Sequence, residues 1–175
     1  MRISVRIYSF LALIAFTNTT FASINNLLPE AKLEKGTTAT WNVGVGITQK
    51  LVHANLEWVN PYGIAYTKAG AFYNDDNEFG AQVGFRYPYH LTGKDKNGYY
   101  IGAYAGHIDS KVVNGEDKAR LGGGVDFSYV MLSQERISTL SVGLGAGEKL
   151  KSKSGHVVAD TEPKIQFSYT LSIGL

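Results

Sequence analysis

Three side chains of the types used in nucleophilic catalysis lie close together in this sequence: His107, Asp109 and Ser110. A histidine base, a carboxylate that orients it and a serine hydroxyl are the groups of an acyl-transfer site. In an extended strand, however, His107 and Asp109 share one face with apolar Ala103 and Ala105. A triad needs a geometry that adjacency in sequence does not supply, so we expect rim and loop residues here and keep catalysis as the alternative.

Other residue types that could bind a ligand give simpler interpretations. His53 and Glu57 share one face of a predicted strand, but four residues of strand separate them by about 13 Å, too far to share a metal ion. The glycines at 122–124 lie in mid-strand and open no helix, unlike a phosphate-binding loop. The chain has no cysteine. We therefore predict neither a metal site nor a cofactor.

The elements that would position these residues are strands, and the clearest is the stretch 163–175, PKIQFSYTLSIGL. From Ile165 to Leu175 every odd position is apolar or aromatic, and every even position is polar or glycine. This period of two predicts a strand with one apolar and one polar face. The strand has the length to cross a bilayer, which takes about 9 to 11 tilted residues.

Seven further runs alternate in a similar way and are separated by polar or proline-containing turns. The run 62–73 is less regular, because Lys68 falls in phase with Ile64 and Tyr66. A β-bulge there would explain this, since an extra residue reverses the phase of all that follow. We predict an all-β fold, an eight-stranded antiparallel up-and-down transmembrane β-barrel. Its first seven strands are 37–48, 51–59, 62–73, 79–87, 99–108, 119–131 and 137–147.

Residues 1–22 are predicted to be a signal peptide. Arg2 and Arg6 form a basic start, 7–16 an apolar core, and Thr20-Phe21-Ala22 a small-x-small cleavage site. A membrane-anchor helix is the alternative, but it would need about 20 apolar residues, and the polar stretch 17–20 ends the run too early.

The remaining 153 residues suit one domain, with a periplasmic N-terminal tail at 23–36 and a barrel domain at 37–175. An amphipathic helix lying on the membrane is the alternative for the tail. Loss of Arg2 and Arg6 with the leader lowers Lys plus Arg from 17 to 15, equal to the 15 Asp plus Glu. A neutral mature chain gives no reason to expect nucleic acid as a partner.

Tyr169, Leu171, Ile173 and Leu175 resemble the C-terminal sorting signal of bacterial outer-membrane β-barrels, although that family usually ends in Phe. The mature chain resembles the small eight-stranded barrels of the OmpA and OmpX kind. The resemblance implies a monomer in the bacterial cell outer membrane of a Gram-negative organism. It also implies contact with outer-membrane lipid and lipopolysaccharide, and recognition of 163–175 by the barrel-assembly machinery.

An even number of strands places both termini on one side, which in bacterial barrels is the periplasm. The predicted outer loops are 48–50, 74–78, 109–118 and 148–160, and the predicted periplasmic turns are at 60, 88–98 and 132–136. In the last outer loop, Lys149, Lys151 and Lys153 are candidates for contact with lipopolysaccharide phosphates, and a solvated loop is the alternative.

Aromatic residues mark the predicted membrane interfaces, where Trp and Tyr are enriched. Phe72 and Phe79 are expected at the outer end of the wall. The periplasmic set is Trp41, Trp58, Tyr62, Tyr87, Tyr99 and Tyr129.

The inward phase of the strands predicts two tiers of charge in the lumen. Glu57, Arg86 and Asp126 form the periplasmic tier, which Lys68 joins if its strand is bulged. Arg120, Glu162 and Lys164 form the outer tier. An eight-stranded barrel is just wide enough for side chains to fill, so the charges should pair and close the lumen.

These features favour a non-enzymatic surface or structural protein whose outer loops contact lipopolysaccharide or other surface partners. A lipid A-modifying enzyme is the first alternative, and a narrow, porin-like pore is the second. A soluble barrel with an apolar interior is the opposing fold, and the polar inward phase of the strands argues against it.

Overall fold

The computed structural model describes residues 29–34, 36–73, 78–93 and 96–175. The predicted signal peptide and positions 23–28 of the predicted tail lie outside the described residues. Within them, no helix is long and apolar enough to cross a membrane.

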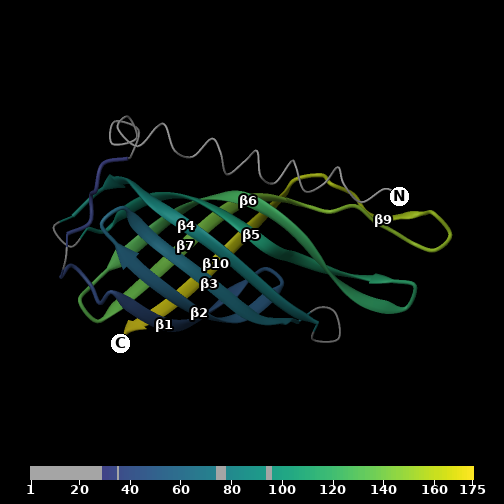
Figure 1. Ribbon diagram of the computed structural model, residues 1–175, viewed down its shortest axis with the longest axis horizontal. Coiled ribbons are helices and arrows are strands. Elements are labelled where there is room, and N and C mark those ends of the chain that lie inside the picture. The colour runs from purple at the N-terminus through teal and green to yellow at the C-terminus, as the bar shows by residue number, and fades with distance from the viewer. Residues whose placement is uncertain (1–28, 35, 74–77, 94–95) are drawn as a thin grey trace, which may run out of the picture. The chain divides into compact units, whose positions relative to one another are not determined.

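Eight strands of the described chain form one closed barrel, in the order β1-β10-β7-β6-β5-β4-β3-β2, and every neighbouring pair is antiparallel (Figure 1). The predicted all-β, eight-stranded antiparallel barrel is therefore confirmed. The strands of the barrel are β1 Trp41–Thr48, β2 Leu51–Asn60, β3 Gly63–Phe72, β4 Phe79–Leu91, β5 Gly98–Val113, β6 Glu116–Leu132, β7 Arg136–Gly147 and β10 Lys164–Gly174.

The two ends of the barrel differ. We call the end that carries Trp41, Leu175 and the turn at Pro61 the terminal end. The opposite end carries the turn at Gln49 and the tip of the β5–β6 hairpin, and we call it the hairpin end.

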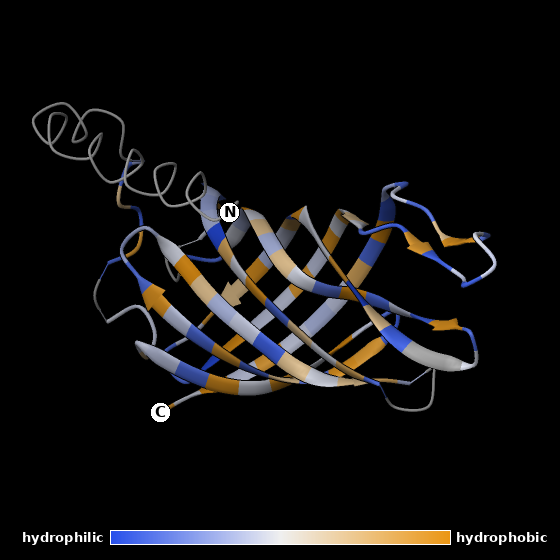
Figure 2. Ribbon diagram, turned by 45° about the vertical axis from the view of Figure 1, so that its right-hand side comes forward, coloured by the Kyte–Doolittle hydropathy of each residue, from blue (hydrophilic) through white to orange (hydrophobic). Residues whose placement is uncertain are grey.

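Alternation along each strand separates the two faces of the wall. In β2, Leu51, His53, Asn55 and Glu57 are buried, and the residues between them are exposed. Figure 2 shows the resulting bands of apolar and polar residues along the crossing strands. In β10, Thr170 and Ser172 are buried, whereas the apolar residues beside them face outward.

The barrel closes between its first and last strands. Val43 lies opposite Ile173, Val45 opposite Leu171, and Ile47 opposite Tyr169. All these side chains are exposed on the outward face. Such cross-strand apolar pairs set the register, because a slip of one residue would turn every side chain to the other face.

The predicted connection 88–98 is shorter than expected. β4 continues through Pro88 to Leu91, and the register shifts between Pro88 and His90, where the proline lacks an N–H for the ladder. The predicted turn 88–98 is therefore wrong at its start. The turn is closed by a 2.7 Å hydrogen bond from Thr92 N to Asn97 O.

The predicted loop at 109–118 is wrong, because β5 and β6 run on as a paired hairpin. Its two-residue turn is Asn114-Gly115, both with positive φ, 56° and 83°. These angles fit the type I′ turn that Asn-Gly favours. The predicted loop 148–160 also contains a short hairpin, β8 Leu150–Lys151 with β9 Val157–Ala159.

The bulge predicted in 62–73 is also wrong. β3 pairs with β2 and with β4 without a register shift. Ile64, Tyr66, Lys68 and Phe72 all point inward. Phe72 is the last residue of β3, at the hairpin end, but its side chain points into the lumen rather than toward a membrane interface.

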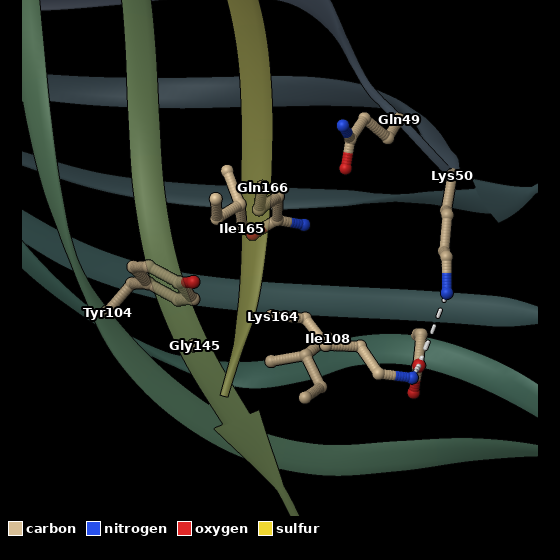
Figure 3. A pocket seen from close by; sticks show the side chains of 9 residues that line it. Gln49, Lys50, Tyr104, Ile108, Gly145, Lys164, Ile165 and Gln166 are labelled. Carbon is tan, nitrogen blue, oxygen red and sulfur yellow. Dashed lines mark hydrogen bonds and ion pairs between the residues drawn. The ribbon is translucent and has the colours of Figure 1, made fainter. Parts of the chain in front are cut away.

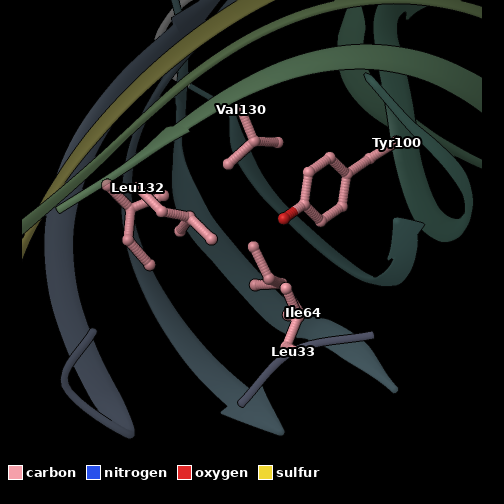
Figure 4. Close-up of a cluster of buried hydrophobic side chains, with 6 residues drawn as sticks. Leu33, Ile64, Tyr100, Val130 and Leu132 are labelled. Atoms are coloured by element: carbon pink, nitrogen blue, oxygen red, sulfur yellow. The ribbon is translucent and has the colours of Figure 1, made fainter. Parts of the chain in front are cut away.

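An apolar cluster fills the terminal end of the lumen (Figure 4). Leu33, from the predicted tail, packs inside it and donates a 3.0 Å backbone hydrogen bond to Pro61 O. Residues 29–34 contain no helix. The cluster is formed by Leu33, Ile64, Tyr100, Val130, Leu132 and Ile137.

Candidate functional site

The first charged group of the lumen is centred on Arg86 of β4. Its Nε lies 3.2 Å from Asp126 Oδ2 on β6, and its NH1 lies 3.7 Å from Glu57 Oε1 on β2. The exposed fractions of Arg86, Glu57 and Asp126 are 0%, 1% and 7%. The structure thus brings together the three residues that the sequence assigned to the periplasmic tier.

Hydroxyl and amide groups surround this triad of charges. Ser172 Oγ donates a 2.5 Å hydrogen bond to Glu57 Oε2 and accepts one from Asn55 Nδ2 at 2.8 Å. Arg86 NH2 contacts Ser141 Oγ at 3.4 Å. Buried charges need such partners, because an unpaired buried ion costs several kcal/mol.

Lys68 lies next to this group and is buried without a bulge in its strand. Its Nζ is 5.1 Å from the centre of the Tyr66 ring, whose other contact is the Arg86 guanidinium at 4.1 Å. With Lys68 included, two cations face two carboxylates, so this part of the lumen is neutral. Between Lys68 and Tyr104 the remaining space is about 10 Å³, roughly the room needed for one water molecule.

The second charged group lies nearer the hairpin end and is centred on Asp109 of β5. Arg120 NH1 and Lys50 Nζ each lie 3.2 Å from Asp109 Oδ2, and Lys164 Nζ lies 4.0 Å from the same atom. Arg120 also donates to two backbone carbonyls, Glu148 O at 3.1 Å and Asp160 O at 2.8 Å. Arg120 therefore fastens the 148–160 segment to the barrel wall.

Asp109 reaches the lumen through a β-bulge that the sequence analysis missed. The register of β5 against β6 shifts between His107 and Asp109, so Ile108 is the extra residue. Gly106, just before it, has a φ of 137°. The expectation that His107 and Asp109 share a face is therefore wrong, because the bulge turns the carboxylate inward.

The hydrogen bonds of the three catalytic candidates lead to other partners. His107 Nδ1 accepts a 3.0 Å hydrogen bond from Ala81 N, and its carbonyl accepts one from Gln82 Nε2 at 2.8 Å. Asp109 is engaged by the cations, and Ser110 is fully buried. In the part of the chain that the structure describes, no hydrogen bond joins any two of the three.

The remaining predicted site residues lie at the surface. Glu162 is exposed in the segment before β10, and among the described residues no ion pair joins it to Arg120 or Lys164. Lys149, Lys151 and Lys153 are exposed, and Lys149 Nζ lies 3.9 Å from Asp160 Oδ1. The Thr161 N–H and Lys149 lower the pKa of the Asp160 carboxyl below its usual value. Among the described residues, no cluster of His, Asp and Glu could hold a metal ion.

The hairpins at the hairpin end are joined to one another. Asn114 Oδ1 accepts hydrogen bonds from Ser152 Oγ at 2.8 Å and from Lys153 N at 3.0 Å. The tip of the β5–β6 hairpin is thus tied to the segment between β8 and β9. Lys153 presents its side chain from this junction rather than from an isolated loop.

Two clusters of aromatic residues lie on the outward face near the terminal end. Trp41 and Trp58 are register partners and stack with ring centres 6.2 Å apart. Tyr99 lies 5.4 Å from Phe127 and 5.2 Å from Tyr129. Tyr129 is half-buried and the other four side chains are exposed, so both clusters face the surroundings of the barrel.

No protein-family model, curated protein or solved structure matches this chain. The geometry alone therefore carries the functional argument. It shows a barrel whose lumen is filled by an apolar cluster and two charged groups.

Proposed function

We propose that this chain is an integral outer-membrane β-barrel with a non-enzymatic surface or structural role. Its hairpin end faces outward and contacts lipopolysaccharide or other surface partners. The observation that carries the proposal is the polarity of the wall, which is apolar outside and charged inside.

The outward face carries large apolar side chains around the barrel. The exposed fractions of Val45, Leu140 and Ile173 are 65%, 57% and 60%. Soluble monomers rarely expose contiguous apolar patches of more than a few hundred Å². A lipid environment would cover this face, as it does in barrels whose strands alternate apolar-out and polar-in.

A soluble barrel that binds an apolar ligand would have the opposite arrangement. In this chain the inner residues include Arg86, Arg120 and Asp109, all buried and paired. Burying these ions while leaving leucine and valine exposed to water would be unfavourable on both counts. The Trp and Tyr side chains on the outward face near the terminal end support the same proposal, because these residue types favour the edges of a bilayer.

The filled lumen supports a structural role over a pore, and the linked hairpins at the hairpin end offer the surface for contact. Lys153 and Lys149 lie there and suit anionic groups of lipopolysaccharide by charge attraction. As part of the same proposal, the barrel-assembly machinery recognises residues 163–175.

The first test is where the full chain is found when it is expressed in a Gram-negative host. We expect it in the outer-membrane fraction, resistant to extraction by urea and carbonate. It should also migrate differently on a gel before and after boiling, because a closed barrel resists detergent. Recovery as a soluble periplasmic protein would overturn the proposal.

The second test is the orientation of the barrel, and the absence of cysteine in the chain gives it a clean background. Single Gly115→Cys and Tyr62→Cys variants place a thiol at the hairpin end and at the terminal end. On intact cells, a membrane-impermeant maleimide should label position 115 and spare position 62 until the membrane is broken. Labelling of both or of neither on intact cells would contradict the orientation.

A further inference from the structure

In the described part of the chain, the hairpin end of the lumen holds more positive than negative charge. Arg120, Lys50 and Lys164 all converge on one carboxylate oxygen, Asp109 Oδ2. Arg120 and Asp109 are both buried and neutralise one another at 3.2 Å. The ammonium groups of Lys50 and Lys164 are therefore left with an uncompensated charge.

Among the described residues, the carboxylates of Asp160, Glu148 and Glu162 do not remove this excess. Asp160 is paired with Lys149, and Glu148 Oε1 accepts from Leu121 N at 3.5 Å. Glu162 is exposed and does not line the cavity between the two lysines. The charged group around Arg86 is neutral with Lys68 included, and none of its four charged residues lines this cavity.

A cavity of about 140 Å³ lies between Lys50, from the β1–β2 turn, and Lys164, from β10 (Figure 3). Its volume corresponds to roughly four to five water molecules at about 30 Å³ each. Gln49 and Gln166 line it with amide groups, and Tyr104 lines it with its ring. The side chains of Lys50 and Lys164 are 29% and 53% exposed, so the cavity is reachable from solvent.

The distances suit one anion held by both lysines. Because both Nζ atoms lie near the same oxygen, their separation cannot exceed the sum of 3.2 and 4.0 Å. An oxyanion that accepts a hydrogen bond of about 2.8 Å from each ammonium can span such a gap. The cavity is lined by both lysines and by Asp109, whose charge Arg120 balances, so its net charge is positive and attracts a counter-ion.

We propose that this cavity at the hairpin end of the barrel is a binding site for a phosphate group, held between Lys50 and Lys164. Gln49 and Gln166 complete the site with amide donors. The phosphate is either a free anion or the headgroup of a phosphorylated lipid.

The test measures phosphate binding by the full chain, folded in a non-ionic detergent at low salt. Inorganic phosphate and pyrophosphate are titrated by calorimetry, and the lysines are followed by NMR after ¹³C-methylation, which keeps their charge. We expect saturable binding that weakens with added salt, with shifts confined to Lys50 and Lys164. Lys50→Gln and Lys164→Gln should each weaken binding about fivefold, as expected for one partly solvated charge pair.

Lys96→Gln is the matched control, because Lys96 pairs with Glu34 and does not line the cavity. Its affinity should equal that of the wild type. Absence of saturable binding of inorganic phosphate, pyrophosphate and a phosphorylated lipid alike, or equal losses in Lys96→Gln and Lys164→Gln, would overturn the proposal.

A second titration uses micelles that contain phosphorylated or dephosphorylated lipid A, and so separates the two sources. Shifts of Lys50 and Lys164 with inorganic phosphate identify a soluble anion as sufficient. Shifts only with the phosphorylated lipid identify a headgroup. Shifts of equal size with the dephosphorylated lipid would exclude phosphate as the recognised group.

Discussion

Arg86 lies between Glu57 and Asp126 at the centre of the wall, and all three are withdrawn from solvent. We predict that Arg86→Ala destabilises the folded barrel by roughly 3 to 5 kcal/mol, because it leaves two buried carboxylates without their cation. The free energy of unfolding can be measured by urea titration in detergent micelles.

Arg136→Ala is the control, since Arg136 is exposed at the first position of β7. Its effect should stay within about 0.5 kcal/mol, as for most surface substitutions. A neutral Arg86→Ala would show that Glu57 and Asp126 are hydrated, and hence that they line a wet pore.

His107 gives a second prediction at the scale of one residue. His107→Ala should leave the host's lipid A unchanged, because the imidazole accepts from the Ala81 N–H and, in the described chain, forms no hydrogen bond with Asp109 or Ser110. Mass spectra of lipid A from cells that express the wild type and the variant test this. A mass difference that appears with the wild type and disappears with His107→Ala would instead favour the enzyme.

The inner residues illustrate how far strand phase alone can predict a site. Glu57, Arg86 and Asp126 follow from it because β2, β4 and β6 are regular around them. Asp109 does not, because one extra residue at Ile108 reverses its direction. Nothing in the composition of that stretch distinguishes the bulge, although Gly106 is compatible with the unusual backbone there.

At the scale of elements, β10 closes the barrel by pairing with β1 on one side and β7 on the other. We predict that deletion of 163–175 abolishes membrane assembly, because it leaves two open sheet edges in lipid. Heat-modifiability and membrane extraction report the outcome.

Replacement of 152–156, the segment between β8 and β9, by a short Gly-Ser linker is the matched control. It removes residues outside the barrel and should leave assembly intact. A β10-deleted chain that still resists extraction and keeps its folded gel mobility would refute the closure that the register shows.

The bulge in β5 depends on Gly106. A Cβ added there would lie 2.2 Å from Ala81 O, at a φ of 137° that L side chains rarely adopt. We predict that Gly106→Ala destabilises the barrel by about 1 to 3 kcal/mol through clash and backbone strain. Gly93→Ala, where a Cβ meets open space, should be close to neutral in the same urea titration.

The strands with uninterrupted alternation, β7 and β10, were predicted almost to the residue. The β5–β6 hairpin was not, because its outer half carries Lys111, Asn114 and Lys118, whose polarity indicates a loop. The Asn114-Gly115 pair was the available signal for a tight hairpin. Backbone hydrogen bonds between β5 and β6 extend the hairpin beyond the apolar wall. Such bonds do not require apolar side chains, so this extension has no apolar alternation in the sequence.

At the scale of the whole molecule, the lumen is closed in series by the apolar cluster and by the two charged groups. We predict that the wild-type barrel conducts poorly in planar bilayers. Removal of 31–34, which takes away Leu33, should change the conductance little, because the charged groups remain. Steady large channels from the wild type would contradict a closed lumen.

Both tryptophans of the chain lie at the same height along the barrel, because Trp41 on β1 is the register partner of Trp58 on β2. The tryptophan fluorescence of the protein, excited at a wavelength that tyrosine does not absorb, therefore originates from a single rim. During insertion into vesicles, a blue shift in tryptophan emission would report when that rim enters the bilayer. It would give no information on the hairpins at the other end. A Phe79→Trp substitution, at an exposed position near the hairpin end of the wall, would report when the other rim enters the bilayer.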